Sequence, residues 1–325
     1  MSLMKQKLRA VMAATMATDG ALRMHEKVSS KKKQRLLDLL FLPVGLKKYI
    51  RLKKSFPSKC EKIAAVVIIK NEGPYIREWL AYHYLVGVSH FYIYDNESTD
   101  GVKEIIKDEI ESGLVDYELI KGKVRQVDAY NMALEKARNN KEYLIVIDAD
   151  EFIFLKNKDD SLYELCHDLI TNNSKVGSLA INWVIFGSSH FQKAQKGLVT
   201  QTYLYRSRFN FEKNKHIKTI CNPFKVAGFI NPHFPEHLKD YYSINIARKR
   251  VIGPYSQPIY NPRIRINHYF TKSKEEFLQK RARGKADGNS IRSISEFKEH
   301  DKNDVYDSSM KRYALPLEEL LKKSK

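Results

Sequence analysis

The feature that most constrains this chain is a repeated change of period between residues 63 and 148. Apolar runs of strand type lie at 63–69, 89–95, 114–120 and 143–148. Between them, apolar residues recur at helical spacing, at 74–87, 102–111 and 125–140. Strands that alternate with helices in this way form a parallel sheet covered by helices. The sequence therefore predicts an α/β fold with a mostly parallel sheet flanked by helices.

Outside this block the periodicity is looser. The pattern predicts a helix at 161–171, a strand at 176–187 and a helix at 273–288, whereas 188–270 holds only short extended pieces. Residues 1–30 are expected to be weakly ordered. We therefore expect three parts: a basic helical arm at 1–60, a main domain at 61–290 whose C-terminal region is looser, and a helical tail at 291–325.

Three carboxylates crowd the end of the last strand of the block. Asp148, Asp150 and Glu151 follow the buried run YLIVI within four positions. Such carboxylates repel one another unless a cation lies between them, and oxygen ligands select Mg²⁺ or Mn²⁺. Polar residues also end two other strands, at 70–72 and 95–96, on the edge where ligands bind parallel sheets. The alternative is a solvated loop, where Asp is common.

Five motifs in order resemble one enzyme family. They are KNEGPYIREWLAYHYLVGVSHFYIYDNESTDG, then Gln126, then DADEF, NWVIFGSSH and NHYFTKSKEEF. Together they resemble the family 2-like and family 92-like glycosyltransferases, which use nucleotide sugars and have the GT-A fold. The resemblance spans roughly residues 63–284 and implies a GT-A-type, Rossmann-like sheet with a C-terminal acceptor side.

The resemblance also implies roles for residues at the strand ends. It implies that Asp148 and Asp150 bind the metal and the donor diphosphate. The other implied donor-binding residues are Lys70, Asn71, Glu72, Asp95, Arg125 and Gln126. Asp95 also suits a plain turn, since Asp-Asn forms turns by itself, and Arg125 also suits an exposed surface position.

Later residues complete the implied site. By resemblance, His268 is a third metal ligand and Lys272 neutralises the leaving diphosphate; the alternatives are a core histidine and a surface lysine. His233 is a rival metal ligand or an acceptor contact. Trp183, with Phe186, suits the floor of a sugar site or core packing. The resemblance implies an inverting reaction with Mn²⁺ or Mg²⁺, and either Glu151 or Glu236 as general base. Glu151 also suits a supporting role behind a ligand.

Positive charge is concentrated in the arm. Of the net charge of +19, most lies in residues 1–60, which hold 15 Lys and Arg against 3 Asp and Glu. Residues 31–54 mix leucines with flanking lysines, as in a helix that lies on anionic lipid. The alternative is a short helix packed on the main domain. No nucleic-acid-binding motif accompanies the charge, so no nucleic-acid partner is expected.

The remaining features bear on location and competing functions. The chain has no apolar run long enough for a membrane span and no recognisable signal peptide, and Cys60, Cys166 and Cys221 suit reduced thiols. We expect a cytoplasmic protein, with a peripheral position on the inner membrane face as an option. The expected substrates are a nucleoside-diphosphate sugar and a glycan or glycolipid acceptor, in surface polysaccharide synthesis. The alternative is a non-catalytic carbohydrate- or nucleotide-binding protein.

Overall fold

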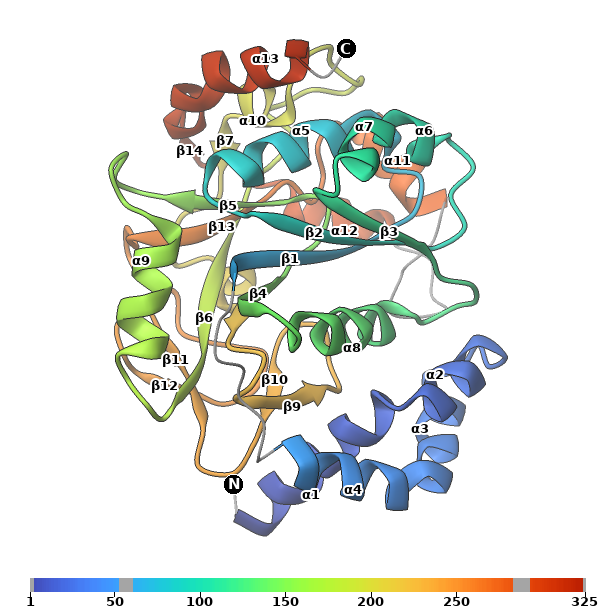
Figure 1. The fold of residues 1–325 in the computed structure, drawn as a ribbon. Coiled ribbons are helices and arrows are strands. Elements are labelled where there is room, and N and C mark those ends of the chain that lie inside the picture. The colour runs from blue at the N-terminus through green and yellow to red at the C-terminus, as the bar shows by residue number, and fades with distance from the viewer. Residues whose placement is uncertain (1–2, 53–60, 283–292, 324–325) are drawn as a thin grey trace.

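The computed structural model describes residues 3–52, 61–282 and 293–323, and one large twisted sheet runs through it (Figure 1). The strand order in this sheet is β12-β11-β6-β8-β4-β1-β2-β3, and β13 joins β6 to β5. The strands are β1 (Glu61–Ile69), β2 (His90–Asp95), β3 (Val115–Leu119), β4 (Lys141–Val146), β5 (Glu151–Leu155), β6 (Val176–Ile185), β7 (Tyr205–Arg206), β8 (Ile217–Cys221), β9 (Val226–Phe229), β10 (Pro235–His237), β11 (Tyr242–Asn245), β12 (Arg250–Val251), β13 (Ile264–His268) and β14 (Val305–Tyr306).

Helices cover both faces of the sheet. In Figure 1, α5, α6 and α7 lie on one face and α8 on the other. The helices are α1 (Leu3–Met16), α2 (Asp19–Glu26), α3 (Lys31–Asp38), η1 (Leu39–Phe41), α4 (Leu42–Leu52), α5 (Gly73–Leu85), α6 (Val102–Ile105), α7 (Lys107–Glu111), α8 (Gln126–Ala137), α9 (Leu162–Cys166), η2 (His167–Thr171), α10 (Val199–Thr202), η3 (Glu212–Lys215), α11 (Lys274–Ala282), α12 (Ile294–His300), η4 (Ser309–Tyr313) and α13 (Ala314–Lys323). The predicted α/β fold is confirmed.

The order of the parallel strands fixes where a ligand can bind. Strands β4, β1, β2 and β3 are parallel neighbours, and the chain runs from β1 outward through β2 and β3 before it returns to the other side as β4. The direction of the strand order therefore reverses between β1 and β4. Ligands of open α/β sheets bind at such a switch point, beyond the carboxyl ends of the strands.

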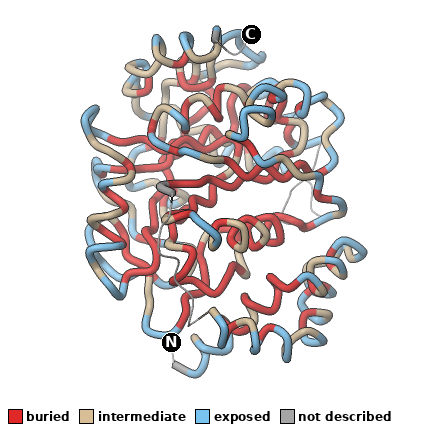
Figure 2. Tube along the Cα trace, in the orientation of Figure 1, coloured by how far each residue is buried: buried red, intermediate tan, exposed pale blue. Residues whose placement is uncertain are grey.

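The apolar run predicted as a strand at 63–69 is buried on both faces of the sheet. Ile63, Ala65, Val67 and Ile69 face the hydrophobic cluster under α5, while Ala64, Val66 and Ile68 face the cluster under α8. A central strand buried on both faces needs such a continuous apolar run. The trace in Figure 2 is accordingly buried along this part of the sheet.

Some boundaries differ from those predicted. The helix expected at 102–111 is divided into α6 and α7 at Ile106, and β5 was not predicted at all. β5 pairs antiparallel with β13, so the carboxylates after β4 lie in a turn between two strands. Cys166 and Cys221 are buried free thiols, and Cys60 lies outside the described residues. No helix in the described ranges is both long and apolar enough to cross a bilayer.

The expectation that residues 1–30 are weakly ordered is wrong for residues 3–30, the part of this segment that the structure describes. Helices α1 and α2 are well formed, and Ala10, Ala13 and Ala14 of α1 are buried where that helix packs on α4 and β9. The contact of α1 with α4 and β9 is close because the residues that form it are small. A Cβ added at Gly228 would lie 2.9 Å from the carbonyl oxygen of Ala13. An alanine-rich seam carries little hydrophobic signal in the sequence, which is why it was missed.

A buried ion cluster attaches α2 and α3 to the main domain; we call it the His25 clamp, formed by His25, Asp38 and Asp128. The His25 ring nitrogens lie 2.8 Å from Asp128 Oδ1 and 2.8 Å from Asp38 Oδ1. Burial opposes protonation, but these hydrogen bonds raise the pKa of His25 to about 9. The imidazolium therefore joins two carboxylates at neutral pH. Because Asp128 lies in the first turn of α8, the arm holds the start of that helix.

We expect the substitution His25→Ala to lower the free energy of unfolding by about 3 kcal/mol, because it leaves two buried carboxylates without their shared cation. The pKa of His25 is raised on folding, from 6.5 to about 9. Its contribution is therefore complete below pH 6.5 and is lost as the pH rises through 9. Urea unfolding from pH 6 to pH 10 checks this, with Lys33→Gln on the same hairpin as control. A deficit that does not change with pH would contradict the charge on His25.

Candidate active site

Helix α5 stabilises the turn that follows β4. Trp79 of α5 is fully buried, and its Nε1–H donates to the carbonyl oxygens of Asp148, at 3.1 Å, and Glu151, at 3.0 Å. Within the turn, the Asp148 N–H donates to Glu151 Oε2 at 2.9 Å. Glu151 thus closes the turn that carries Asp148 and Asp150.

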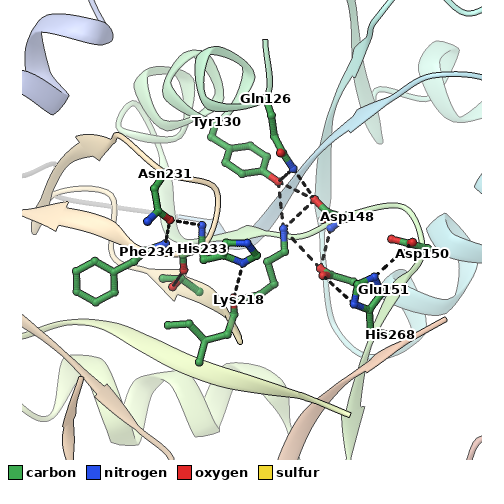
Figure 3. Close-up of polar contacts among 12 residues, drawn as sticks. Gln126, Tyr130, Asp148, Asp150, Glu151, Lys218, Asn231, His233, Phe234 and His268 are labelled. Atoms are coloured by element: carbon green, nitrogen blue, oxygen red, sulfur yellow. Dashed lines mark hydrogen bonds and ion pairs between the residues drawn. The ribbon is translucent and has the colours of Figure 1, made fainter. Parts of the chain in front are cut away.

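Asp148 is the centre of a polar cluster that we call the Asp148 cluster: Gln126, Tyr130, Asp148, Glu151 and Lys218 (Figure 3). The Oδ1 atom of Asp148 lies 2.8 Å from Lys218 Nζ. It accepts hydrogen bonds from Gln126 Nε2, at 2.8 Å, and from Tyr130 OH, at 2.9 Å. Gln126 and Tyr130 are one turn apart on α8. The helix tied to the arm by the His25 clamp therefore also orients Asp148.

Lys218 is the cation of this cluster and was not predicted. It lies on β8, which pairs antiparallel with β4, and its side chain is 1% exposed. Burial lowers the pKa of Lys218, but Asp148 and Glu151 outweigh burial and raise it above its usual range. Burial raises the pKa of Glu151 well above its usual range against the opposing effect of Lys218. Lys218 is therefore charged and compensates Asp148.

Asp150 points to a second group of basic side chains, a lysine and a histidine whose pKa burial lowers. Its Oδ2 accepts a short hydrogen bond from Lys280 of α11 and lies 3.4 Å from His268 Nε2. Burial would raise the pKa of Asp150, but Lys280 and His268 hold it well below its usual range. The antiparallel pairing of β13 with β5 places His268 opposite Glu151, and its Nδ1 lies 3.9 Å from Glu151 Oε1.

The fit of a divalent cation follows from these contacts. Across the described ranges, no three His, Cys, Asp or Glu side chains converge on one point. Asp148 turns to Lys218, so the expected three-ligand set is reduced to Asp150 and His268. Mg²⁺ keeps several waters and often takes one or two protein ligands together with substrate phosphates. Two ligands 3.4 Å apart on one face fit a cation of this kind.

Aromatic rings from three segments surround His268. Trp183 of β6 lies edge-on to His268, with ring centres 4.3 Å apart, and edge-on to His233 at 5.3 Å. It stacks on His216 at 4.8 Å. The Trp183 indole N–H is buried without a hydrogen bond to the described residues. The structure thus brings Trp183, His233 and His268 together, as the sequence predicted, and adds His216.

The residues expected at the nucleotide lie at the ends of β1 and β2. The Asn71 N–H donates to Ser98 Oγ at 2.8 Å, and the Thr99 N–H donates to Asn71 Oδ1 at 2.7 Å. Asp95 accepts from the Ser98 N–H at 2.8 Å and from Tyr117 OH. These bonds make Asp95 a turn-forming residue, the alternative stated above. Lys70 and Glu72 flank Asn71 at the same edge, and nucleotide contact by these residues stays a prediction.

Two predicted residues, Arg125 and Glu236, lie elsewhere, whereas Lys272 lies near Asp150. Arg125 is turned to the arm, where it pairs with Asp128 at 3.1 Å and donates to the Leu22 carbonyl oxygen at 3.1 Å. Glu236 accepts from the guanidinium of Arg9 at 2.6 Å and lines a separate cavity of about 180 Å³ that contains no residue of the Asp148 cluster. Lys272 is buried with its Nζ 4.0 Å from the centre of the Tyr75 ring, near enough to Asp150 to lower the pKa of that residue.

Comparisons with solved structures give only a distant likeness. Residues 1–349 of Staphylococcus aureus TarS match with a TM-score of 0.33 and 14% identity over 50% of this chain and 47% of that one. The TarS complex with UDP-GlcNAc gives the same TM-score and identity. A putative glucose-1-phosphate thymidylyltransferase from Bacillus anthracis matches with a TM-score of 0.32 and 12% identity over 50% of this chain and 72% of that one. Likeness at this level carries no argument about ligands.

Sequence comparison is more specific. A glycosyltransferase family 92 protein of Oryza sativa subsp. japonica is 29% identical over 237 residues, which are 71% of this chain and 37% of the relative. One of Ricinus communis is 25% identical over 224 residues, 68% of this chain and 38% of the relative. The chain thus spans less than two fifths of these relatives. The family model for glycosyltransferase family 92 matches residues 70–300, most of the chain, and the chain therefore belongs to glycosyltransferase family 92.

Proposed function

We propose that this protein transfers a sugar from a nucleoside-diphosphate sugar to a glycan or glycolipid acceptor, with inversion at the anomeric carbon. The observation that carries the proposal is the pair of Asp150 and His268, 3.4 Å apart beside the switch point of the sheet, in a member of glycosyltransferase family 92.

The proposal includes Mn²⁺ or Mg²⁺ held by Asp150 and His268. When bound, the cation would stabilise the negative charge that develops on the leaving diphosphate. Glu151 supports this arrangement from behind, because its Oε1 faces His268 Nδ1 while Oε2 holds the turn. A carboxylate behind a histidine ligand orients the ring and increases its basicity. Among the predicted donor-binding residues, we propose Lys272 and Gln126 for contacts to the diphosphate.

The acceptor hydroxyl requires a group that accepts its proton. Glu151 is fully buried and accepts a hydrogen bond within the turn, and Glu236 is buried and paired with Arg9. Neither carboxylate is therefore exposed to an acceptor hydroxyl. His233 is better placed: its Nδ1–H donates to the Ile217 carbonyl oxygen at 2.9 Å, which leaves Nε2 as the accepting nitrogen. Burial, with the nearby Lys218, lowers the pKa of His233 to about 3, so the neutral ring can accept a hydrogen bond from the hydroxyl but is a weak base until a bound substrate changes its surroundings. We favour His233 as the residue that contacts the acceptor hydroxyl.

A surface of the arm suits anionic lipid and would hold the enzyme near lipid-linked acceptors in surface polysaccharide synthesis. We define the outer face as Leu36, Leu39, Leu40, Val44 and Ile50, all exposed, with Leu40 at 69%. The exposed charges beside it are Lys32, Lys33, Arg35, Lys47 and Arg51. Asp38 is the single acid between residues 31 and 52, and it is buried in the His25 clamp. Apolar side chains flanked by positive charge alone favour an anionic bilayer surface.

We expect Asp150→Asn to reduce transfer on the order of 1000-fold, because the substitution removes the carboxylate charge that would hold the cation. Asp148→Ala is less suitable, since it leaves the buried Lys218 without its closest carboxylate. Turnover is followed by release of nucleoside diphosphate from UDP-, GDP- and TDP-sugars, and of CMP from CMP-sugars, with and without EDTA and added Mn²⁺. Asp159→Asn, in an exposed loop, is the control. Full activity in demetallated protein would reject the metal, and donor binding without turnover would favour a non-catalytic protein.

We expect His233→Asn to lose turnover while donor affinity is retained, because asparagine can keep the bond to Ile217 but has no counterpart of Nε2. His233→Gln, which places an amide near Nε2, should retain more activity than His233→Asn. Glu236→Gln should be nearly normal, and Glu151→Gln should weaken metal binding because it changes the support of His268. Steady-state kinetics with varied donor and acceptor separate these effects. Loss of turnover in Glu236→Gln with unchanged donor affinity would instead make Glu236 the base.

We expect full-length protein to bind anionic vesicles and the double variant Leu36→Glu, Leu40→Glu to lose that binding. Each basic residue near an anionic surface contributes about 1 kcal/mol, and the attraction should weaken with salt. Co-sedimentation with phosphatidylserine-containing and neutral phosphatidylcholine vesicles measures it. Leu315→Glu on α13, at the opposite end of the molecule in Figure 1, is the matched control. Wild-type protein that ignores anionic vesicles at low salt would exclude the lipid surface.

A further inference from the structure

One carboxylate oxygen in the candidate site, Asp150 Oδ2, has two basic neighbours. Asp150 Oδ2 accepts a hydrogen bond from Lys280 Nζ and also faces His268 Nε2 at 3.4 Å. All three side chains are buried, and Lys280 is 8% exposed. The ammonium of Lys280 is further fixed by a hydrogen bond of 3.1 Å to the Phe270 carbonyl oxygen and by the Phe270 ring, whose centre is 4.3 Å away. Lys280 therefore occupies a defined position on the metal side of Asp150.

A divalent cation between Asp150 and His268 would need the same oxygen. Such cations lie about 2.0–2.2 Å from their oxygen and nitrogen ligands. An ammonium that stays within hydrogen-bond distance of that oxygen is then only a few ångströms from a double positive charge. In a buried site this repulsion is strong, because little water screens it. The ammonium and the cation are therefore alternatives at Asp150 Oδ2, unless an anion arrives with the cation.

The donor of the proposed reaction supplies such an anion. Its diphosphate oxygens can accept hydrogen bonds from a displaced lysine and can complete the coordination of the cation at the same time. A cation without donor gains Asp150 and His268 but displaces Lys280 from its carboxylate. A cation that binds together with the donor gains the same two ligands, and Lys280 exchanges the Asp150 carboxylate for a diphosphate oxygen.

We propose that Lys280 is a tethered cation that neutralises Asp150 in the donor-free protein and makes the binding of metal and donor diphosphate depend on each other. The proposal rests on the function proposed above. It explains why a lysine is buried against the carboxylate that is best placed to hold a metal. In this arrangement Lys280 also compensates the charge of Asp150 both before the donor binds and after the product leaves. Coupling of this kind is reciprocal, so each ligand strengthens the binding of the other.

The test measures Mn²⁺ binding alone, by the loss of the free Mn²⁺ signal in electron paramagnetic resonance, without donor or turnover. We expect weak binding to the wild-type protein and binding about tenfold tighter or more to Lys280→Met, within the usual range of coupling effects. Lys280→Arg keeps the charge and should resemble the wild type. Lys274→Met, an exposed position on the same helix, should also resemble it. Asp150→Asn should abolish binding in each background, and circular dichroism checks that each variant is folded.

Addition of UDP then tests the coupling. UDP should tighten Mn²⁺ binding by about tenfold or more in the wild type and by clearly less in Lys280→Met. Equal Mn²⁺ affinity of wild type and Lys280→Met overturns the inference while the metal site stands. Weaker binding in Lys280→Met also overturns it, because Lys280 would then organise the site. Absence of Mn²⁺ binding in every variant, with and without UDP, rejects both this inference and the metal in the proposed function. If Mn²⁺ binds and only UDP has no effect, GDP and TDP replace it, and failure of all three diphosphates overturns the coupling.

Discussion

The structure depends on the compensation of three carboxylates that follow a buried strand. Asp148, Asp150 and Glu151 leave β4 at the switch point of the sheet, where the surrounding core excludes water, and uncompensated charges there would cost several kcal/mol each. Their partners come from distant parts of the chain: the ammonium groups of Lys218 on β8 and Lys280 on α11, and the imidazole of His268 on β13, whose pKa is lowered by burial. The strands β8 and β13 are therefore more than additions to a parallel sheet. They carry partners of the carboxylates in the turn after β4.

The supporting residues also explain why this turn is rigid. Trp79 donates to two carbonyl oxygens of the turn, and Glu151 accepts from its first amide, so the backbone is fixed from the α5 side and from within. On the other face of the sheet, α8 presents Gln126 and Tyr130 to Asp148. Since the His25 clamp holds the first turn of α8, the arm contributes to the orientation of Asp148 without contacting it. Positioning of this kind is what a site needs when a small displacement reduces catalysis.

Much of this could be predicted from the sequence, and the omissions have physical reasons. The strand and helix periods located β1 to β4, and carboxylates after a buried strand located the site. The resemblance then located Trp183, His233 and His268, which the structure brings together. Lys218 was missed because a lysine in a short segment such as HIKTIC is expected on the exposed face of a strand. Lys280 was missed because KEEFLQKRA is typical of a surface helix. In both cases the partner that permits burial is a carboxylate far away in sequence, which no local pattern reveals. The same holds for His25, whose partners Asp38 and Asp128 belong to different helices.

The His25 clamp has a consequence for how such a chain can change over evolutionary time. Asp128 lies within the part matched by the family model, whereas His25 and Asp38 lie before it. A charge buried in the shared domain is thus compensated by Arg125 of that domain and by a residue of a segment outside it. Loss of the arm would leave Asp128 with Arg125 alone, at a bared surface of α8, and would remove the carbonyl partner of Arg125. A change in the arm therefore has a cost inside the domain, at the first turn of α8.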